Sequence, residues 1–300
     1  MIYDIRHRTV FSYEQAVSIS HHVLHLTPRR GPRQVCERSA IAVDPAPATR
    51  SDGRDYFGNP IAILTVEAPH RRLEIHASSR VEVLPPPPVD PERSMAWDGV
   101  ARLLEHSTAP SVLDAYQYVF GSPYVAIGDE VYDFARTSFP PGRPILAAVM
   151  DLTRRIYREF EYKGGVTDVS TPVRAVLATR KGVCQDFAHL QIACLRSLGL
   201  PARYVSGYLL TRPPEGKERL VGADASHAWL SVWCPKNGWV DFDPTNNLIP
   251  GDEHIMLAWG RDYGDVSPIN GVMIGGSSHS VAVAVDVMPV PVPQEQPAAP

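Results

Sequence analysis

The sequence lacks the features that would place the protein in a membrane or on a nucleic acid. No apolar run approaches the ~20 residues that a helix needs to cross a bilayer, and the N-terminus has no continuous apolar segment of the signal-peptide kind. No basic run with interleaved aromatic residues is present, and the formal net charge is −4. We therefore expect a cytoplasmic protein with no membrane and no nucleic-acid partner.

Cysteine is also scarce, with four residues in a chain of 300 and no Cys-x-x-Cys pair. They are Cys36, Cys184, Cys194 and Cys234. This wide spacing argues against a disulfide framework and favours free thiols. A histidine cluster at residues 21–25 has no further ligands at zinc-like spacing, so we expect neither a metal nor a cofactor.

Proline, by contrast, is abundant, and its 29 residues cluster at joints. Four consecutive prolines at 85–88 predict a stiff spacer between two domains. We expect a β-rich N-terminal domain at residues 1–84, a Pro-rich linker at 85–93 and a second domain at 94–290. A disordered Pro-rich tail is expected at 291–300.

The first domain shows period-two alternation and turn signals, including one at residues 52–54, which together predict a β-sandwich-like domain. Its strand candidates are residues 3–9, 22–27, 40–43, 61–66 and 73–83. The pattern of the second domain predicts helices followed by strands, which indicates an α+β fold class with helices packed on an antiparallel sheet. Helices are expected at 95–106, 111–120, 128–136, 145–160, 171–180 and from 184, and strands at 203–209, 228–234, 239–242 and 279–290. Between residues 250 and 279 the pattern is weak.

Cys184 is the candidate nucleophile, because it lies where an apolar-faced helix begins. Thr171 is expected to cap the preceding short helix and Gly182 to end it. A thiol at a helix N-terminus lies at the positive end of the dipole, which favours the reactive thiolate. The alternative is that Cys184 packs as a small apolar side chain, as most free cysteines do.

His227 and Asp243 are the expected partners of this thiol. They are 16 residues apart, and turn residues at 235–238 predict a hairpin centred on residue 235. An even separation places both side chains on one face of the hairpin. Asp241 shares that face and is the rival carboxylate, although it lies further from the strand end.

His189 is the rival base, but it lies about 140° around the helix from Cys184, so a structural role is expected. A metal site built from Cys184, Asp186, His189 and His227 is conceivable by residue type. Its spacing matches no familiar zinc pattern. The polar loop at residues 211–224 is long enough to border a site.

Several segments closely resemble the bacterial transglutaminase-like superfamily in order and spacing. They are residues 182–188 (GVCQDFA), 199–208 (GLPARYVSGY), 227–229 (HAW), 238–245 (GWVDFDPT) and 260–268 (GRDYGDVSP). The β-rich first domain also resembles the N-terminal region of many bacterial members. The resemblance implies a papain-like core with a triad in which Cys184 is the nucleophile, His227 the general base and acid, and Asp243 the orienting group. Animal members bind calcium through acidic loops, and this sequence contains no comparable acidic cluster.

The resemblance implies an enzyme that acts on amides through a Cys184 thioester, with peptides, proteins or small amides as substrates. Hydrolysis is the first expectation, because indiscriminate cross-linking would be harmful in the cytoplasm. Transfer of the acyl group from a glutamine carboxamide to an amine is the alternative, since it uses the same residues. A binding module that keeps the fold without catalysis is a third hypothesis. The sequence carries no signal for an oligomeric state.

Overall fold

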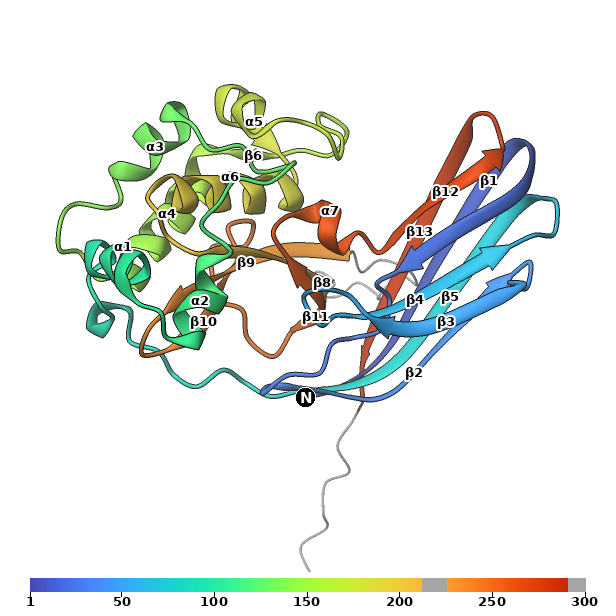
Figure 1. Ribbon diagram of the computed structural model, residues 1–300, viewed down its shortest axis with the longest axis horizontal. Helices are drawn as coiled ribbons and strands as arrows, with labels where there is room; N and C mark the ends of the chain where they lie inside the picture. Colours follow the sequence, from blue (N-terminus) through green and yellow to red (C-terminus); the bar gives the residue numbers. More distant parts are fainter. Residues whose placement is uncertain (212–225, 291–300) are drawn as a thin grey trace, which may run out of the picture.

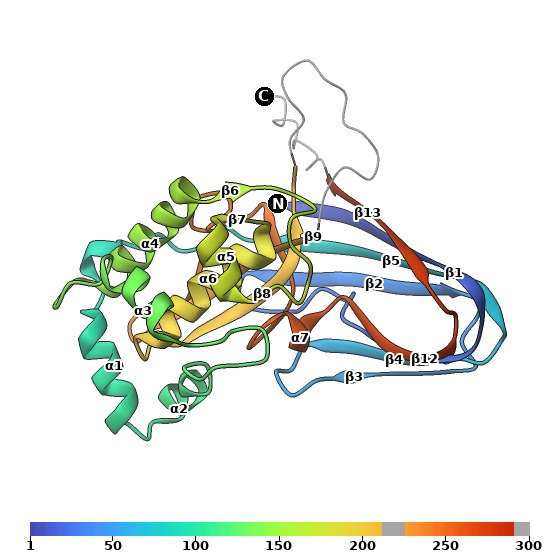
Figure 2. The same ribbon diagram turned by 90° about the horizontal axis from the view of Figure 1, so that it is seen from above.

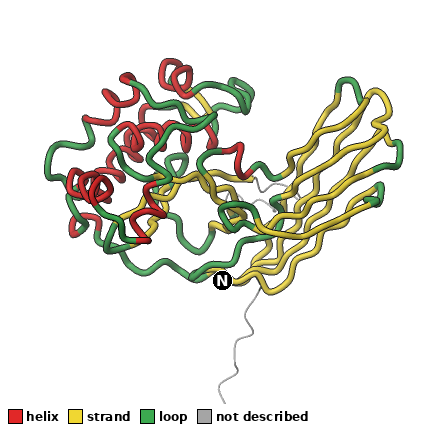
Figure 3. The backbone as a smooth tube through the Cα atoms, in the orientation of Figure 1, coloured by secondary structure: helices red, strands yellow, loops and turns green. Residues whose placement is uncertain are grey.

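The computed structural model describes residues 1–211 and 226–290, which form two lobes (Figure 1). We call them the β lobe and the mixed lobe. In Figure 3 the β lobe consists of long strands, while the mixed lobe carries the helices. The loop predicted at 211–224, apart from its first residue, and the tail predicted at 291–300 lie outside the described residues. Among the described residues, no helix is long and apolar enough to span a lipid bilayer.

The β lobe is one antiparallel sheet of seven strands. Its strands are β1 (Ile2–Leu24), β2 (Gln34–Asp44), β3 (Thr49–Arg54), β4 (Pro60–Val66), β5 (His70–Val83), β12 (Ile269–Gly275) and β13 (His279–Pro289). Strand β1 runs the full length of the sheet, with β4 and β5 in succession along one edge and β12 and β13 along the other. Strands β3 and β2 pair outside β4 and β5.

This long sheet curls so that its inner face encloses an apolar core (Figure 2). Leu24, Leu64, Leu73 and Ile75 are buried there with at most 1% of their surface exposed. The sandwich-like character predicted from short strands therefore comes from one continuous sheet that curls over its own face. The turn predicted at residues 52–54 lies inside β3.

The division of the chain between lobes differs from the expected boundaries at the C-terminal side. Strand β5 ends at Val83, close to the expected boundary, but residues 269–289 pair with β1 instead of joining the mixed lobe. Val285 and Val287 are buried on the same sheet face as Ile5, and this burial explains why the last strand returns to the first.

The mixed lobe packs helices against a four-stranded antiparallel sheet, in the order β10-β9-β8-β11. The strands are β8 (Ala202–Leu209), β9 (Ser226–Cys234), β10 (Gly238–Phe242) and β11 (His254–Gly260), with a two-stranded pair of β6 (Glu161–Tyr162) and β7 (Lys181–Gly182). The helices are η1 (Pro91–Arg93), α1 (Trp97–His106), α2 (Pro110–Tyr116), α3 (Asp129–Arg136), α4 (Ile145–Glu159), α5 (Val173–Thr179), α6 (Cys184–Ser197) and α7 (Tyr263–Val266). Helix α6 is buried on nearly all faces, because the sheet covers one side and other helices cover the rest. This arrangement confirms the predicted α+β class.

The β lobe holds strand β11 through two side-chain amides. The Gln34 amide donates to the carbonyl of Met256 at 2.7 Å and accepts from its N–H at 2.8 Å. Asn59 does the same at Trp259, with distances of 2.8 and 3.0 Å. Since β11 is the last strand of its sheet, these amides satisfy backbone groups that would otherwise be unpaired at an edge.

Candidate active site

Cys184 is the first residue of α6, and its placement depends on a close backbone approach. The chain leaves α5 through Arg180 in the left-handed region, with φ of 56°. A Cβ at Gly182 would lie 2.8 Å from the Asp186 carboxylate, which accepts from the N–H of Val183 at 2.8 Å. The prediction that Gly182 ends the preceding helix is therefore wrong: Arg180 turns the chain, and Gly182 makes room for the carboxylate that caps α6.

The segment at residues 163–171 is fixed beside the nucleophile by two hydrogen bonds. The hydroxyl of Thr167 donates to Asp186 Oδ2 at 2.7 Å, and Gln185 Nε2 donates to the carbonyl of Val169 at 3.2 Å. Burial raises the pKa of Asp186, although these donors oppose it. The two residues that follow Cys184 thus anchor one wall of the site. Thr171, expected to cap α5, lies outside the helix, and Pro172 is its N-cap.

His227 and Asp243 meet across the β9–β10 hairpin. The hairpin is centred one residue further on than predicted, which shifts the pairing by two residues: its last pair is Phe242 with Leu230, and Asp243 follows beyond it, not opposite His227. Because side chains alternate along a strand, His227 and Asp243 still share a face and meet diagonally. His227 Nε2 lies 2.8 Å from Asp243 Oδ2.

Asp243 is completely buried and accepts several hydrogen bonds. Its Oδ1 accepts from the backbone N–H groups of Thr245 and Asn246, at 2.9 and 3.2 Å. Its Oδ2 accepts from Asn246 Nδ2 at 2.7 Å as well as from His227. Burial alone would raise the pKa of Asp243, but hydrogen bonds from His227 and His254 hold it below its ordinary value. The side chain is therefore a carboxylate at neutral pH.

The pKa of His227 is shifted in the opposite direction to that of Asp243. Burial would lower its pKa, but hydrogen bonds to Asp243 and to Cys184 raise the pKa above its ordinary value. Since Nε2 faces Asp243, Nδ1 is the nitrogen that remains for the thiol of Cys184. The structure thus brings Cys184, His227 and Asp243 together, with the imidazole between the sulfur and the carboxylate.

The two rival residues lie elsewhere. Asp241 accepts a short hydrogen bond from the hydroxyl of Ser231 and lies 3.9 Å from Arg33 of the β lobe. His189 Nε2 accepts from the N–H of Tyr263 at 3.1 Å, and burial lowers the pKa of His189 to about 4. Its place on the helix matches the structural role expected from the helical rotation.

The four cysteines, all of which are described, differ in exposure. Cys36, Cys194 and Cys234 are buried, whereas Cys184 is partly exposed. Burial raises the pKa of Cys36, and it raises the pKa of Cys194 to about 12. Cys184 is therefore the thiol to which a reagent or substrate has access.

His254, the first residue of β11, belongs to this site although the sequence did not predict it. Its Nε2 lies 3.1 Å from Asp243 Oδ2. Within the described residues, His227, Asp243 and His254 are the one group of three potential metal-ligating side chains whose atoms all lie within 4.8 Å of one another. By residue type this group could hold a divalent metal, and it is equally a carboxylate flanked by two imidazole donors. The only sequence signal was a histidine that opens an apolar segment.

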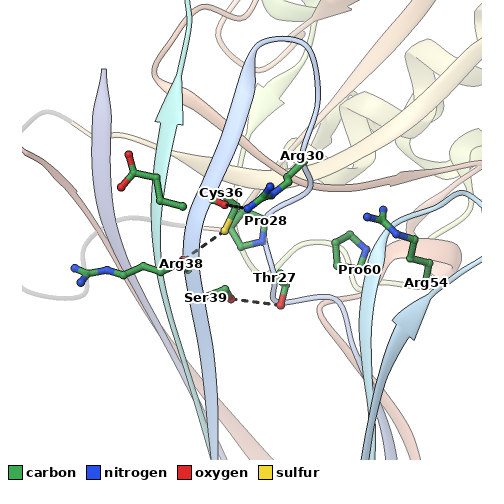
Figure 4. Close-up of a pocket in the computed structure, with 9 residues that line it drawn as sticks. Thr27, Pro28, Arg30, Cys36, Arg38, Ser39, Arg54 and Pro60 are labelled. Atoms are coloured by element: carbon green, nitrogen blue, oxygen red, sulfur yellow. Dashed lines mark hydrogen bonds between the residues drawn. The ribbon is translucent and has the colours of Figure 1, made fainter.

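A separate hollow of about 220 Å³ lies in the β lobe (Figure 4). Arg30, Arg38 and Arg54 are among its lining residues, and Arg30 donates to the carbonyl of Cys36 at 2.8 Å. It shares no residue with the Cys184 site, so we treat it as a surface feature of the β lobe.

Comparisons with known proteins agree with this architecture. Residues 3–82 match the bacterial transglutaminase-like N-terminal region, and residues 134–244 match the transglutaminase-like superfamily. A candidate cysteine protease from Cytophaga hutchinsonii has a similar fold, with a TM-score of 0.74, 21% identity, and coverage of 97% of this chain and 92% of that one.

Curated relatives extend the similarity along the chain. An uncharacterised protein of Mycobacterium tuberculosis (strain ATCC 25618 / H37Rv) is 43% identical over 295 residues, which cover 96% of this chain and 92% of the relative. One from Mycobacterium leprae is 32% identical over 287 residues, or 94% of this chain and 96% of the relative. A protein-glutamine gamma-glutamyltransferase of Pseudomonas aeruginosa is 40% identical over 73 residues, which are 24% of this chain and 11% of that protein. With relatives matched over nearly its full length and both regions recognised in order, the chain belongs to the transglutaminase-like superfamily.

Proposed function

We propose that the protein hydrolyses amide bonds through a thioester on Cys184. One observation carries this proposal: the partly exposed cysteine at the start of buried helix α6 hydrogen-bonds to His227, which is paired with the buried carboxylate of Asp243. A nucleophile, a base and a group that orients the base are the parts that covalent acyl transfer requires.

In this mechanism the Cys184 thiolate attacks the substrate carbonyl to form a C–S bond, and the imidazolium of His227 gives its proton to the leaving amine as the C–N bond breaks. The raised pKa of His227 means that this proton is present at neutral pH. The backbone N–H of Cys184, which has no intrahelical acceptor at the first position of α6, stabilises the oxyanion. His227 then takes a proton from a water molecule as the water oxygen attacks the thioester carbonyl. The C–S bond breaks, the acid is released, and the Cys184 thiolate and the His227 imidazolium are restored.

Transfer to an amine is the second candidate, and the local match to a protein-glutamine gamma-glutamyltransferase favours it. An amine would replace water in the last step, while every residue keeps its role. Water is our first choice of acceptor because it needs no binding site of its own.

The test uses 4-nitrophenyl acetate and a glutamine-containing peptide with cadaverine as the amine. We expect a burst of nitrophenol, an acetyl adduct on the Cys184 peptide by mass spectrometry, and loss of both in Cys184→Ala but not in the matched variant Cys36→Ala. With the peptide, the free acid should be the main product. A cadaverine adduct as main product would replace hydrolysis by transfer. Full turnover by Cys184→Ala would refute the thioester mechanism itself.

A further inference from the structure

Asp243 is held from more than one structural element. Thr245 and Asn246, which follow it in the chain, bind it locally, and His227 approaches it from β9. His254 approaches the same Oδ2 atom from β11, at 3.1 Å. His254 is therefore the contact that connects the carboxylate to a strand other than those of its own hairpin.

The surroundings of His254 fix the position of its ring and determine which ring nitrogen faces Asp243. The side chain is buried, and its ring lies edge-on to Trp229, with centroids 5.2 Å apart and an interplanar angle of 85°. Its Nδ1 is buried without a hydrogen-bond partner among the described residues, and its Nε2 faces the carboxylate. Because a carboxylate can only accept, the Nε2 that faces it carries the donating N–H.

The packing around Trp229 restricts the movement of the His254 ring. A Cβ at Gly207 would lie 2.5 Å from the Trp229 ring and 2.2 Å from the carbonyl oxygen of Ile255, the residue after His254. The indole therefore fills the space that a side chain at residue 207 would occupy, and it lies against the His254 ring. Strand β11 itself is fixed by the amides of Gln34 and Asn59.

We propose that His254 is a positioning residue that acts through Asp243. Its Nε2–H donates to Oδ2 and prevents the carboxylate from rotating, so that the carboxylate keeps its orientation toward His227 Nε2. This inference rests on the proposed function of the triad. His254 does not contact the reacting atoms in this arrangement, so its removal should slow the steps in which His227 moves a proton and leave substrate binding unchanged.

The test compares His254→Leu with His254→Gln, whose side-chain amide can restore a donor to Asp243. His22→Gln is the matched control, because His22 and His254 are both 6% exposed and His22 lies in the β lobe. The probe is 4-nitrophenyl acetate with the full-length chain. We expect the turnover that follows the burst to fall roughly tenfold in His254→Leu, with KM unchanged. Turnover should recover to within about threefold of wild type in His254→Gln.

A second readout separates positioning from simple loss of stability. The low-field proton resonance of the His227–Asp243 hydrogen bond, observed with ¹⁵N-labelled histidine, should shift in His254→Leu and return in His254→Gln. A lowered melting temperature with wild-type resonance and turnover would overturn the proposal. Stoichiometric zinc in the purified protein, released in His254→Leu, would also overturn it, because the three side chains would then be a metal centre. A wild type without a Cys184-dependent burst would refute the proposed function instead.

Discussion

A buried histidine of the β lobe, His22, and the buried histidine of the candidate active site, His227, behave in opposite ways. In the β lobe, burial and the neighbouring His70 and His21 lower the pKa of His22 to about 4. In the mixed lobe, His227 is buried to a similar degree, yet Asp243 and Cys184 raise its pKa above the ordinary value. The difference shows that burial alone keeps a histidine neutral, and that a buried carboxylate partner reverses its effect.

The largest effect is expected from a substitution that breaks the pair of His227 and Asp243. Asp243→Asn replaces an acceptor by a group that can donate to His227 Nε2 and so favours the wrong tautomer. We expect turnover of 4-nitrophenyl acetate to fall by roughly 10⁴-fold, by analogy with the same change in a serine protease triad. Asp241→Asn is the matched control and should keep wild-type turnover. Equal losses in the two variants would mean that Asp243 has no special relation to His227.

The next prediction compares cysteines. At pH 6, iodoacetamide should modify Cys184 about 100-fold faster than Cys36 or Cys194, because Cys184 is partly exposed, whereas the other two are buried and burial raises their pKa. Peptide mapping of a time course measures each rate separately. Similar rates for Cys184 and Cys36 in the folded protein would contradict the view that Cys184 is the accessible, reactive thiol.

A smaller effect is expected where the lobes meet. Gln34→Ala removes a buried amide that satisfies both backbone groups of Met256, so the free energy of unfolding should decrease by about 3 kcal/mol. Gln117→Ala provides the control, since the Gln117 amide bonds only within its own helix region, to Asp114. Chemical denaturation monitored by circular dichroism measures both. An unchanged midpoint for Gln34→Ala would show that the Gln34 amide does not stabilise the junction between the lobes.

The smallest effect concerns acid stability. The folded pKa of His22, about 4, lies below the ordinary value of 6.5, so between these pH values the unfolded chain binds more protons. The stability linked to His22 is complete above pH 6.5 and is lost as the pH falls toward 4, by about 2 kcal/mol at pH 5. His22→Leu should flatten this dependence in denaturation curves at pH 5 and 7. An unchanged slope would assign the acid sensitivity to other groups, such as His7, whose pKa burial also lowers to about 4.

Much of the mixed lobe could be predicted, because its helices show clear apolar periodicity and have proline or glycine residues near their ends. Helix α4 was expected at residues 145–160 and spans Ile145–Glu159. The choice between Asp243 and Asp241 rested on distance from the strand end, and the structure places Asp243 against His227. The even spacing of His227 and Asp243 sufficed to put both on one face, because the hairpin pairing differs from the prediction by two residues, which preserves the face.

The strands that were not predicted correctly share one physical cause: each lacks a regular alternation of buried apolar and exposed polar residues. Strand β1 was read as two strands, because its pairing shifts between Ser12 and Val17 and interrupts the alternation. In β12 the apolar Val272 and Ile274 lie on the exposed face, so no hydrophobic-in pattern exists. Strand β11 is buried along most of its length and shows no alternation, which also concealed His254.

The return of β12 and β13 to the first sheet has a mechanical consequence. The chain passes between the lobes twice, through residues 84–90 and again through residues 267–268 (Figure 1). Two bodies joined at two separate points can rotate only about the line through those points, whereas one linker would allow three independent rotations. The amide contacts at Met256 and Trp259 oppose this remaining rotation. The two crossings and the two amides together therefore resist rotation of one lobe against the other.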